Sequence, residues 1–340
     1  MKIVPVEESV GCIIGHDITE ISGGARGKGF KRGHIVRPED VKHLLRLGKR
    51  NICVWDDENG DQVHEDDAAR RMAAAIAGTG TTHGEPREGR IDLRAAHQGL
   101  FSVNLELLTR LNSIPYVTIA TRHTLQEVQP EDSLIGVRVT PLAVPESTVD
   151  AVESCCRESG PLAKVIPFRK LKVAIVTTGS EVASGLVKDE FGPVLKAKFA
   201  AWGSEVISQV VVTDETAITT EAIKNALASG AEMIAVTGGM SVDPDDKTPA
   251  AIRAVGCDIV TYGAPVFPGA MFMLGYMGNI PVMGLPGCVM YRRATILDFI
   301  VPRILAGHRI TRHDITNLAH GGLCDSCKVC TYPQCSFGKF

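Results

Sequence analysis

The stretch VTGGMSVDPDDKT, from Val236 to Thr248, contains the residue types of an anion site. Gly238 and Gly239 follow an apolar run that predicts a buried strand, and glycine there lets the backbone approach a ligand closely and adopt positive φ. Three acids come next: Asp243, Asp245 and Asp246. Beside a phosphate these acids would repel the ligand unless a cation intervened, and Mg²⁺ binds one or two carboxylates together with phosphate oxygens. We predict a phosphate site with Mg²⁺ on Asp246. The alternative is that Asp245 or Asp246 caps the next helix.

Three further apolar runs in the same half of the chain end at a glycine turn. In an open α/β sheet, ligands bind outside the carboxyl ends of the strands, because the loops converge there. The N-terminus of a following helix favours an anion by about 0.3–1 kcal/mol. Glycine turns also occur in such sheets without a ligand, which is the structural alternative. The predicted ligand-binding residues are Thr178, Gly179, Ser180, Glu181, Gly238, Gly239, Ser241, Asp243, Thr248, Pro268, Gly269, Pro286 and Gly287.

The elements that must position these turns follow from the apolar pattern. From Leu171 onward, short apolar runs such as KVAIVTT alternate with helical segments such as TAITTEAIKNALASG. This alternation predicts a parallel sheet covered by helices on both faces. We therefore expect residues 166–310 to form a three-layer, doubly wound α/β domain with a mostly parallel sheet. Residues 1–165 mix short strands and helices without a clear period, which predicts a mixed α+β domain.

Four cysteines lie close together near the end of the chain, in CDSCKVCTYPQC. Gaps of two residues allow neighbouring thiolates to bind one metal centre. The Cys-x₂-Cys-x₂-Cys spacing resembles ferredoxin-type iron–sulfur ligation, and four thiolates equally suit tetrahedral zinc. A redox relay of thiols is a third possibility. We predict that residues 311–340 form a metal-binding tail whose ligands are Cys324, Cys327, Cys330 and Cys335.

Composition limits the class of protein. A chain of 340 residues is long enough for about two domains. The formal net charge of −3 gives no basic field that would favour nucleic acid. No apolar run reaches the roughly 18 residues that a membrane helix needs, and Pro5, Glu7 and Glu8 interrupt the region where a signal peptide would be apolar. We expect a cytoplasmic protein that binds neither nucleic acid nor membrane.

Four motifs carry a family resemblance: TTGSEV, TGGMSVDPDDKT, PGAMFMLG and GLPG. Their order and spacing resemble the molybdopterin-binding domain of molybdenum cofactor biosynthesis enzymes. From about Lys172 to Gly307 the chain is similar to molybdopterin molybdenumtransferases, and also to molybdopterin adenylyltransferases. The resemblance implies molybdopterin or its adenylylated form as ligand, with Asp246 and Mg²⁺ acting at the pyrophosphate and at molybdate. It further implies molybdenum insertion with release of AMP, a homodimer, and molybdoenzyme or other cofactor-pathway partners.

The same comparison identifies departures from the family pattern. Ser180 stands where the family has an acid, and Cys288 where it has asparagine. No lysine occurs between Lys247 and Lys328, and fewer cations lower the positive potential that would attract molybdate. These departures favour an alternative, a non-catalytic molybdopterin carrier or sensor with a redox- or metal-responsive cysteine tail. A nucleotide-handling enzyme on the same fold is a third hypothesis.

A basic run lies in the N-terminal part of the chain. Its side chains could supply positive charge to the ligand, or could simply be the solvated flanks of a β-hairpin. The residues are Arg26, Lys28, Lys31 and Arg32.

Overall fold

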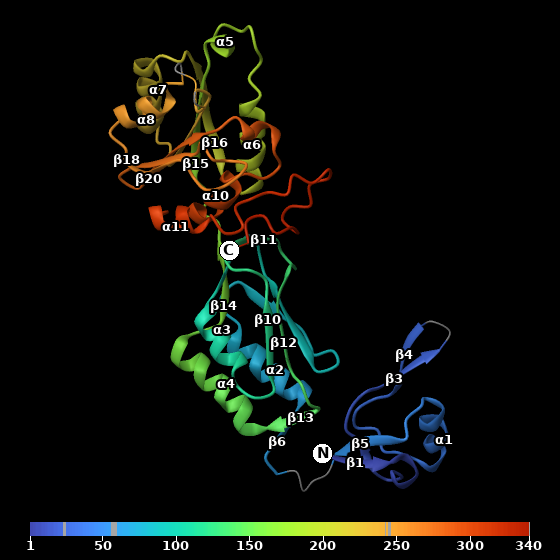
Figure 1. Ribbon diagram of the computed structural model, residues 1–340. Coiled ribbons are helices and arrows are strands. Elements are labelled where there is room, and N and C mark those ends of the chain that lie inside the picture. The colour runs from blue at the N-terminus through green and yellow to red at the C-terminus, as the bar shows by residue number, and fades with distance from the viewer. Residues whose placement is uncertain (23–24, 56–59, 242, 244–245, 340) are drawn as a thin grey trace. The chain divides into compact units, whose positions relative to one another are not determined.

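The computed structural model describes every residue except 23–24, 56–59, 242, 244–245 and 340. The chain forms two compact units, coloured along the chain in Figure 1. The first unit contains residues 1–96, 103–122 and 131–164, and the second contains residues 97–102, 123–130 and 165–340.

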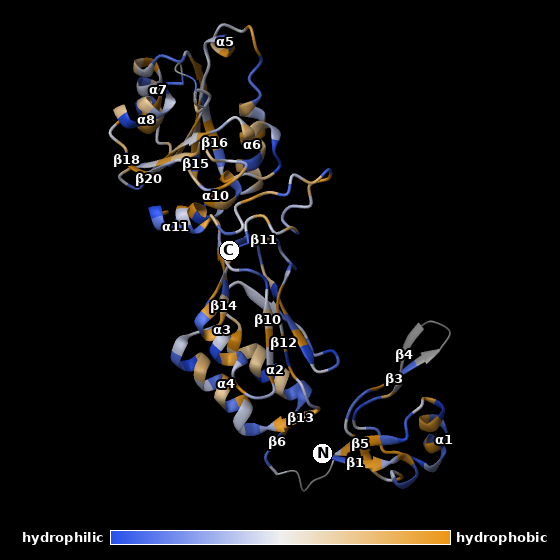
Figure 2. Cartoon of the chain, in the orientation of Figure 1, coloured by the Kyte–Doolittle hydropathy of each residue, from blue (hydrophilic) through white to orange (hydrophobic). Residues whose placement is uncertain are grey.

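The first unit begins with a small β-rich part, residues 1–55, which we term the N-terminal lobe. Its three-stranded antiparallel sheet has the order β1-β5-β2. Apolar residues gather on β1 and β5 (Figure 2), and Ile52 and Val54 of β5 point into a core with Leu44. The elements of the lobe are β1 (Lys2–Pro5), η1 (Val6–Glu8), β2 (Ile13–Ile14), β3 (Ile18–Ser22), β4 (Ala25–Phe30), α1 (Pro38–Arg46) and β5 (Asn51–Trp55).

The rest of the first unit is built on a four-stranded antiparallel sheet of order β10-β12-β8-β7. Helices α2 and α4 contact each other, and α2 also contacts strands β8 and β12. Alanine suits this position because its small side chain lets α2 approach the sheet closely, and Ala68, Ala69 and Ala73 are fully buried. The elements are β6 (Gln62–His64), α2 (Glu65–Ile76), β7 (Thr81–His83), β8 (Arg90–Ala95), α3 (Leu105–Asn112), β10 (Val117–Thr121), β12 (Ser133–Val139), β13 (Ala143–Pro145) and α4 (Glu146–Ser159).

Three short strands form a separate sheet of order β11-β9-β14. Their bounds are Gly99–Val103 for β9, Gln126–Val128 for β11 and Ala163–Pro167 for β14.

The second unit is organised around a six-stranded sheet of order β16-β15-β17-β20-β19-β18. Strands β16, β15, β17 and β20 are mutually parallel, whereas β19 runs antiparallel to both of its neighbours. The predicted α/β fold with a mostly parallel sheet is therefore confirmed. The strands are β15 (Lys172–Thr178), β16 (Glu205–Val212), β17 (Met233–Thr237), β18 (Asp258–Tyr262), β19 (Met273–Met277) and β20 (Ile280–Leu285).

Helices cover both faces of this sheet. One face packs against α6 and α10, where Leu195, Phe199 and Ile300 are buried, and the other packs against α7 and α8, where Ile223 and Ile252 are buried. Because both faces are covered, β15 is buried from its second residue onward and β17 is buried along its whole length. The helices are α5 (Ser180–Ala183), α6 (Phe191–Ala201), α7 (Thr216–Ala228), α8 (Thr248–Ala254), α9 (Cys288–Tyr291), α10 (Leu297–Leu305) and α11 (Arg312–Asn317).

The segment after α11 packs onto the second unit. Phe337 is 2% exposed, and its ring centroid lies 4.8 Å from that of Phe299 in α10. The ring centroid of Tyr332 lies 6.2 Å from that of Phe299. These aromatic contacts attach the cysteine-containing segment to α10. Among the described residues, no helix has the length and apolar character needed to cross a membrane.

Candidate functional site

The topology of the six-stranded sheet determines where the four glycine turns lie. Strand β15 lies between β16 and β17, so the connection after β15 leads to one side and the later strand β17 lies on the other. This reversal of strand order is the place where open α/β sheets bind ligands. The carboxyl ends of β15, β17 and β20 share one edge because these strands are parallel, and β18 also ends there because two antiparallel steps restore its direction. The structure thus brings all four predicted turns to one edge.

A pair of buried threonines joins the turns after β15 and β17. The hydroxyls of Thr178 and Thr248 lie 3.2 Å apart, and the Thr248 hydroxyl also donates to the carbonyl oxygen of Gly238 at 2.9 Å. Thr178 is 4% exposed and Thr248 is 2% exposed, so water does not compete for these bonds. The first residue of α8 therefore fixes the separation of the two glycine turns.

Gly238 and Gly239 have φ of +83° and +52°, a region that side chains other than glycine disfavour. A Cβ on Gly238 would lie 2.0 Å from the carbonyl oxygen of Thr178, and a Cβ on Gly239 would lie 2.9 Å from the Thr248 hydroxyl. Both conformation and close packing thus require glycine. The two glycines thus allow the turn after β17 to pack directly against Thr178 and Thr248.

The turn after β15 is held by an acid from the next strand connection. Asp214, just beyond β16, accepts hydrogen bonds through Oδ2 from the backbone N–H of Ser180 at 2.7 Å and from the Ser180 hydroxyl at 3.0 Å. Gly179 donates its N–H to the carbonyl of Val212 at 3.0 Å. Glu181 is exposed. Ser180 therefore positions this turn through Asp214, an interaction that the sequence analysis did not anticipate.

Asp246 organises the loop that follows Gly239. Its Oδ2 accepts the backbone N–H groups of Ser241 at 2.7 Å and Asp243 at 3.3 Å, while its own N–H donates to the carbonyl of Asp243 at 2.9 Å. The carboxylate thus closes a tight turn of its own loop. Asp245, which the sequence analysis weighed as a helix cap, lies outside the described residues. Lys247, the residue before α8, makes no side-chain cap to that helix.

The two remaining turns differ in their surroundings. Gly269 has φ of +133°, and a Cβ there would lie 2.7 Å from the side chain of Ile296, so this turn packs closely beneath the start of α10. Gly287 is exposed, and a Cβ there would have no atom within 4 Å. Burial raises the pKa of the neighbouring Cys288 thiol.

One acid near this edge was missed from the sequence. Asp189 accepts the N–H groups of Phe191 at 3.0 Å and Gly192 at 3.2 Å, at the start of α6. Its Oδ2 also accepts from Gln209 Nε2 at 2.5 Å, and that amide lies 3.3 Å from the Thr177 hydroxyl. An aspartate shortly before a helical run was the available signal, because aspartate is a preferred helix cap.

The four predicted tail ligands differ in their exposure. In the part of the chain that the structure describes, no three His, Cys, Asp or Glu side chains gather as a metal group. Cys324 and Cys335 lie partly buried against the core, whereas Cys327 and Cys330 are exposed. The backbone N–H of Ser326 donates to Cys324 Sγ at 3.5 Å. Thiolates suit zinc or iron–sulfur chemistry, but this arrangement does not assemble them, and the metal stays a prediction.

Arg32 belongs to the basic run of the N-terminal part. It forms ion pairs with Asp66 and Asp67 in the first unit, at 3.6 and 3.2 Å. Its charge is thus already matched within that unit. The side chains of Arg26 and Lys28 lie outside the described part of the structure.

Comparison with known proteins agrees with the geometry of the sheet edge. Residues 174–306 match a family described as a probable molybdopterin binding domain. This match lies within the second unit. The resemblance inferred from the four motifs is therefore confirmed for this domain. Residues 3–56, in the N-terminal lobe, match a domain of unknown function.

Curated relatives extend the similarity beyond this domain. A molybdopterin molybdenumtransferase from Haemophilus influenzae is 24% identical over 281 residues, which cover 80% of this chain and 64% of the relative. A molybdenum cofactor biosynthesis bifunctional protein from Synechococcus elongatus is 32% identical over 82 residues, or 24% of this chain and 26% of the relative. The chain thus spans less than two thirds of either relative. Among solved structures, the tungsten cofactor synthesizing protein MoaB from Pyrococcus furiosus is 20% identical, with a TM-score of 0.35, covering 42% of this chain and 99% of that one.

Proposed function

We propose that this chain binds molybdopterin, or its adenylylated form, at the carboxyl edge of the six-stranded sheet and acts in molybdenum cofactor biosynthesis. The observation that carries the proposal is the pair of glycine turns joined by the hydroxyls of Thr178 and Thr248, 3.2 Å apart. This pair lies at the switch point of a domain in the molybdopterin-binding family. Glycine at 238 and 239 gives the turn the positive φ that a phosphate-binding backbone loop uses.

The reaction that we propose is that of a molybdopterin molybdenumtransferase. Adenylylated molybdopterin would be hydrolysed at its pyrophosphate, releasing AMP, and molybdate would deliver molybdenum to the dithiolene. The support is the similarity to the Haemophilus influenzae relative over 80% of this chain. The chain's own residues would bind the phosphates through the turn at Gly238 and orient them with Thr248.

Asp246 is the residue that we propose for Mg²⁺. Carboxylate oxygens are the ligands that Mg²⁺ prefers, and the ion would neutralise charge on the pyrophosphate. Asp246 Oδ2 already holds the N–H groups of Ser241 and Asp243, so this carboxylate has a structural role of its own. A test must therefore separate loss of charge from loss of the turn.

The test compares Asp246→Asn with Asp246→Ala and uses Glu221→Gln, an exposed carboxylate of α7 outside the glycine turns, as the matched control. Adenylylated molybdopterin is bound with and without Mg²⁺, molybdate is added, and released AMP is measured. Asparagine keeps a carbonyl oxygen for the turn but removes the charge, so we expect Asp246→Asn to bind the pterin and to lose at least about 100-fold of the AMP release, on the scale of an electrostatic catalytic group. Undiminished AMP release in Asp246→Asn would contradict the assigned role.

The alternative is a non-catalytic carrier or sensor of molybdopterin. The absence of lysine between Lys247 and Lys328 favours it, because cations attract molybdate. Arg292 and Arg293, exposed just after α9, are the cations nearest in sequence to the Pro286–Gly287 turn and favour the enzyme. Tight pterin binding by the wild-type protein without AMP release would identify a carrier. Preferential binding of a plain nucleotide would instead identify a nucleotide-handling enzyme.

Two further proposals have separate tests. We expect a homodimer, to be measured as the solution mass by light scattering. We also expect a soft metal on the tail cysteines, for which the sequence spacing and the Ser326 hydrogen bond to Cys324 are the support. Anaerobically purified protein should then contain zinc, or iron with sulfide, and metal-free protein with four titratable tail thiols would exclude it.

A further inference from the structure

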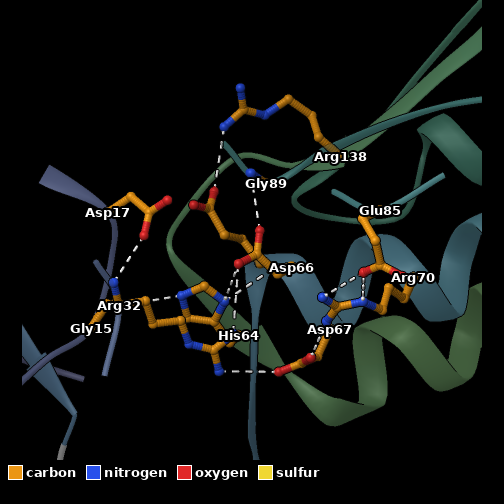
Figure 3. Close-up of polar contacts among 11 residues, drawn as sticks. Gly15, Asp17, Arg32, His64, Asp66, Asp67, Arg70, Glu85, Gly89 and Arg138 are labelled. Carbon is orange, nitrogen blue, oxygen red and sulfur yellow. Dashed lines mark hydrogen bonds and ion pairs between the residues drawn. The ribbon is translucent and has the colours of Figure 1, made fainter. Parts of the chain in front are cut away.

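A cluster of polar side chains connects the N-terminal lobe to the segment that begins helix α2. Figure 3 shows Gly15, Asp17 and Arg32 from the lobe facing His64, Asp66 and Asp67. All belong to the first unit, and none belongs to the candidate ligand site. Besides the pairs of Arg32 with Asp66 and Asp67, the N-terminal amine donates to Gln62 Oε1 at 3.1 Å.

His64 lies at the centre of this cluster and is 2% exposed. Its Nε2 lies 2.7 Å from the carbonyl oxygen of Gly15 in the lobe. Its Nδ1 accepts the backbone N–H of Asp66 at 3.1 Å, so His64 caps helix α2. One imidazole ring thus joins the lobe to the helix terminus.

These two contacts determine the protonation state of the ring. A carbonyl oxygen only accepts, so Nε2 must carry hydrogen, and a backbone N–H only donates, so Nδ1 must be bare. A second proton on Nδ1 would face the Asp66 N–H and remove the cap. The Asp66 carboxylate, with Oδ2 at 3.6 Å from Nδ1, offers partial compensation. The docked arrangement therefore requires a neutral imidazole.

Burial and the charges around His64 also favour the neutral imidazole. Burial lowers the pKa of His64, and the nearby Arg32 lowers it further, while the Gly15 carbonyl, Asp66 and Asp67 oppose them. The neighbouring His16 behaves similarly, because burial and then Lys49 and His64 lower its pKa, against the opposing charge of Asp17. Within the described residues, His16 Nδ1 is buried without a hydrogen-bond partner.

We propose that His64 is a pH-operated latch that holds the N-terminal lobe on the start of helix α2, and that acidification releases the lobe. In the released state the ring reaches water and accepts a proton; in the docked state it cannot do so without losing the cap. The released state therefore binds more protons, and docking is favoured above the ordinary histidine value of about 6.5 and weakens as pH falls through it.

The size of the effect follows from the number of protons taken up. One proton on release changes the ratio of released to docked molecules by at most about tenfold per pH unit, and two protons, if His16 also charges, by at most about a hundredfold. The ion pairs of Arg32 oppose release, but they are partly exposed and are screened by salt. Raising the salt concentration should therefore move release to higher pH.

The experiment measures amide hydrogen exchange of the full chain between pH 7.5 and 5.5, corrected for intrinsic exchange. We expect residues 13–17 and 62–67 of the wild type to lose protection on acidification, while the second unit and the circular dichroism spectrum stay constant. His64→Gln keeps a donor for Gly15 and cannot charge, so its protection should not depend on pH. His64→Asn keeps a cap but does not reach Gly15, so its protection should be low throughout.

Two results would overturn the latch. Either the wild type keeps its protection across this range, or His64→Gln loses protection with the same pH dependence as the wild type. An NMR titration of His64 in the wild-type protein gives a measurement that needs no variant. The docked protein should titrate below about 6.5, and a value at or above that figure would contradict the proposal.

Discussion

Replacing Gly238 with alanine tests how the candidate site is built. The residue has φ of +83°, and an added Cβ would lie 2.0 Å from the carbonyl oxygen of Thr178 and 2.8 Å from its hydroxyl. Thr178 is the last residue of β15 and is buried, so it has little freedom to move away. The substitution must shift either the end of β15 or the turn itself, and both changes disturb the hydroxyl pair with Thr248.

The expected loss has two parts. A left-handed conformation costs a residue with a Cβ about 1–2 kcal/mol. Forcing extra volume into a packed site costs about 1–3 kcal/mol more. We therefore expect Gly238→Ala to lower the free energy of unfolding by about 2–5 kcal/mol, the sum of these two contributions.

Gly203→Ala is the matched control. Gly203 lies in the same unit with φ of +77°, but a Cβ there has no atom within 4 Å, so only the conformational part applies. Urea unfolding followed by circular dichroism compares the two variants, and with a slope of about 1–3 kcal/mol per molar, their midpoints should differ by roughly 1 M. Pterin binding should fail in Gly238→Ala and survive in Gly203→Ala. Equal midpoints would refute the close-packing argument, and normal binding by Gly238→Ala would refute the placement of the ligand.

The remaining predictions concern the threonine pair and the tail. Thr248→Val leaves the Gly238 carbonyl and the Thr178 hydroxyl without their buried partner and should cost about 1–3 kcal/mol in urea unfolding; Thr248→Ser, which keeps the hydroxyl, should cost less, and an equal loss in both would show that the methyl group matters instead. Phe337→Ala removes a side chain that is 2% exposed and should cost about 3 kcal/mol. It should also speed thiol labelling of the partly buried Cys335, with the exposed Cys327 as the internal reference; unchanged labelling would mean that Phe337 does not hold the tail.

The class of fold and the positions of the turns were predictable from local pattern. Continuous apolar runs such as those of β15 and β17 indicate strands buried on both faces, and glycine after a strand marks a turn. Parallel strands must also bring their carboxyl ends to one edge. The turns at Gly179, Gly238 and Gly287 could therefore be placed together without coordinates.

The partners of the polar side chains were not predictable in the same way. Asp246 was predicted as a metal ligand from its charge. In the structure its Oδ2 also accepts hydrogen bonds from backbone N–H groups of its own loop. Asp214 and Asp189 hold other segments at this edge from loops that carry no motif. Hydrogen bonding depends on distances of about 3 Å between residues far apart in sequence, and spacing along the chain does not encode those distances.

The cysteine spacing shows the same division. A Cys-x₂-Cys spacing establishes that thiolates can reach one metal, but packing of Tyr332 and Phe337 on α10 determines where the segment lies. His64 is the clearest example of a property that only the tertiary structure reveals. Nothing near it in the sequence distinguishes a buried histidine from a surface histidine. The sequence by itself determined the sheet and its glycine turns, because these follow from local periodicity and backbone freedom. Only the tertiary structure decided which polar atoms meet, because that depends on how distant segments pack.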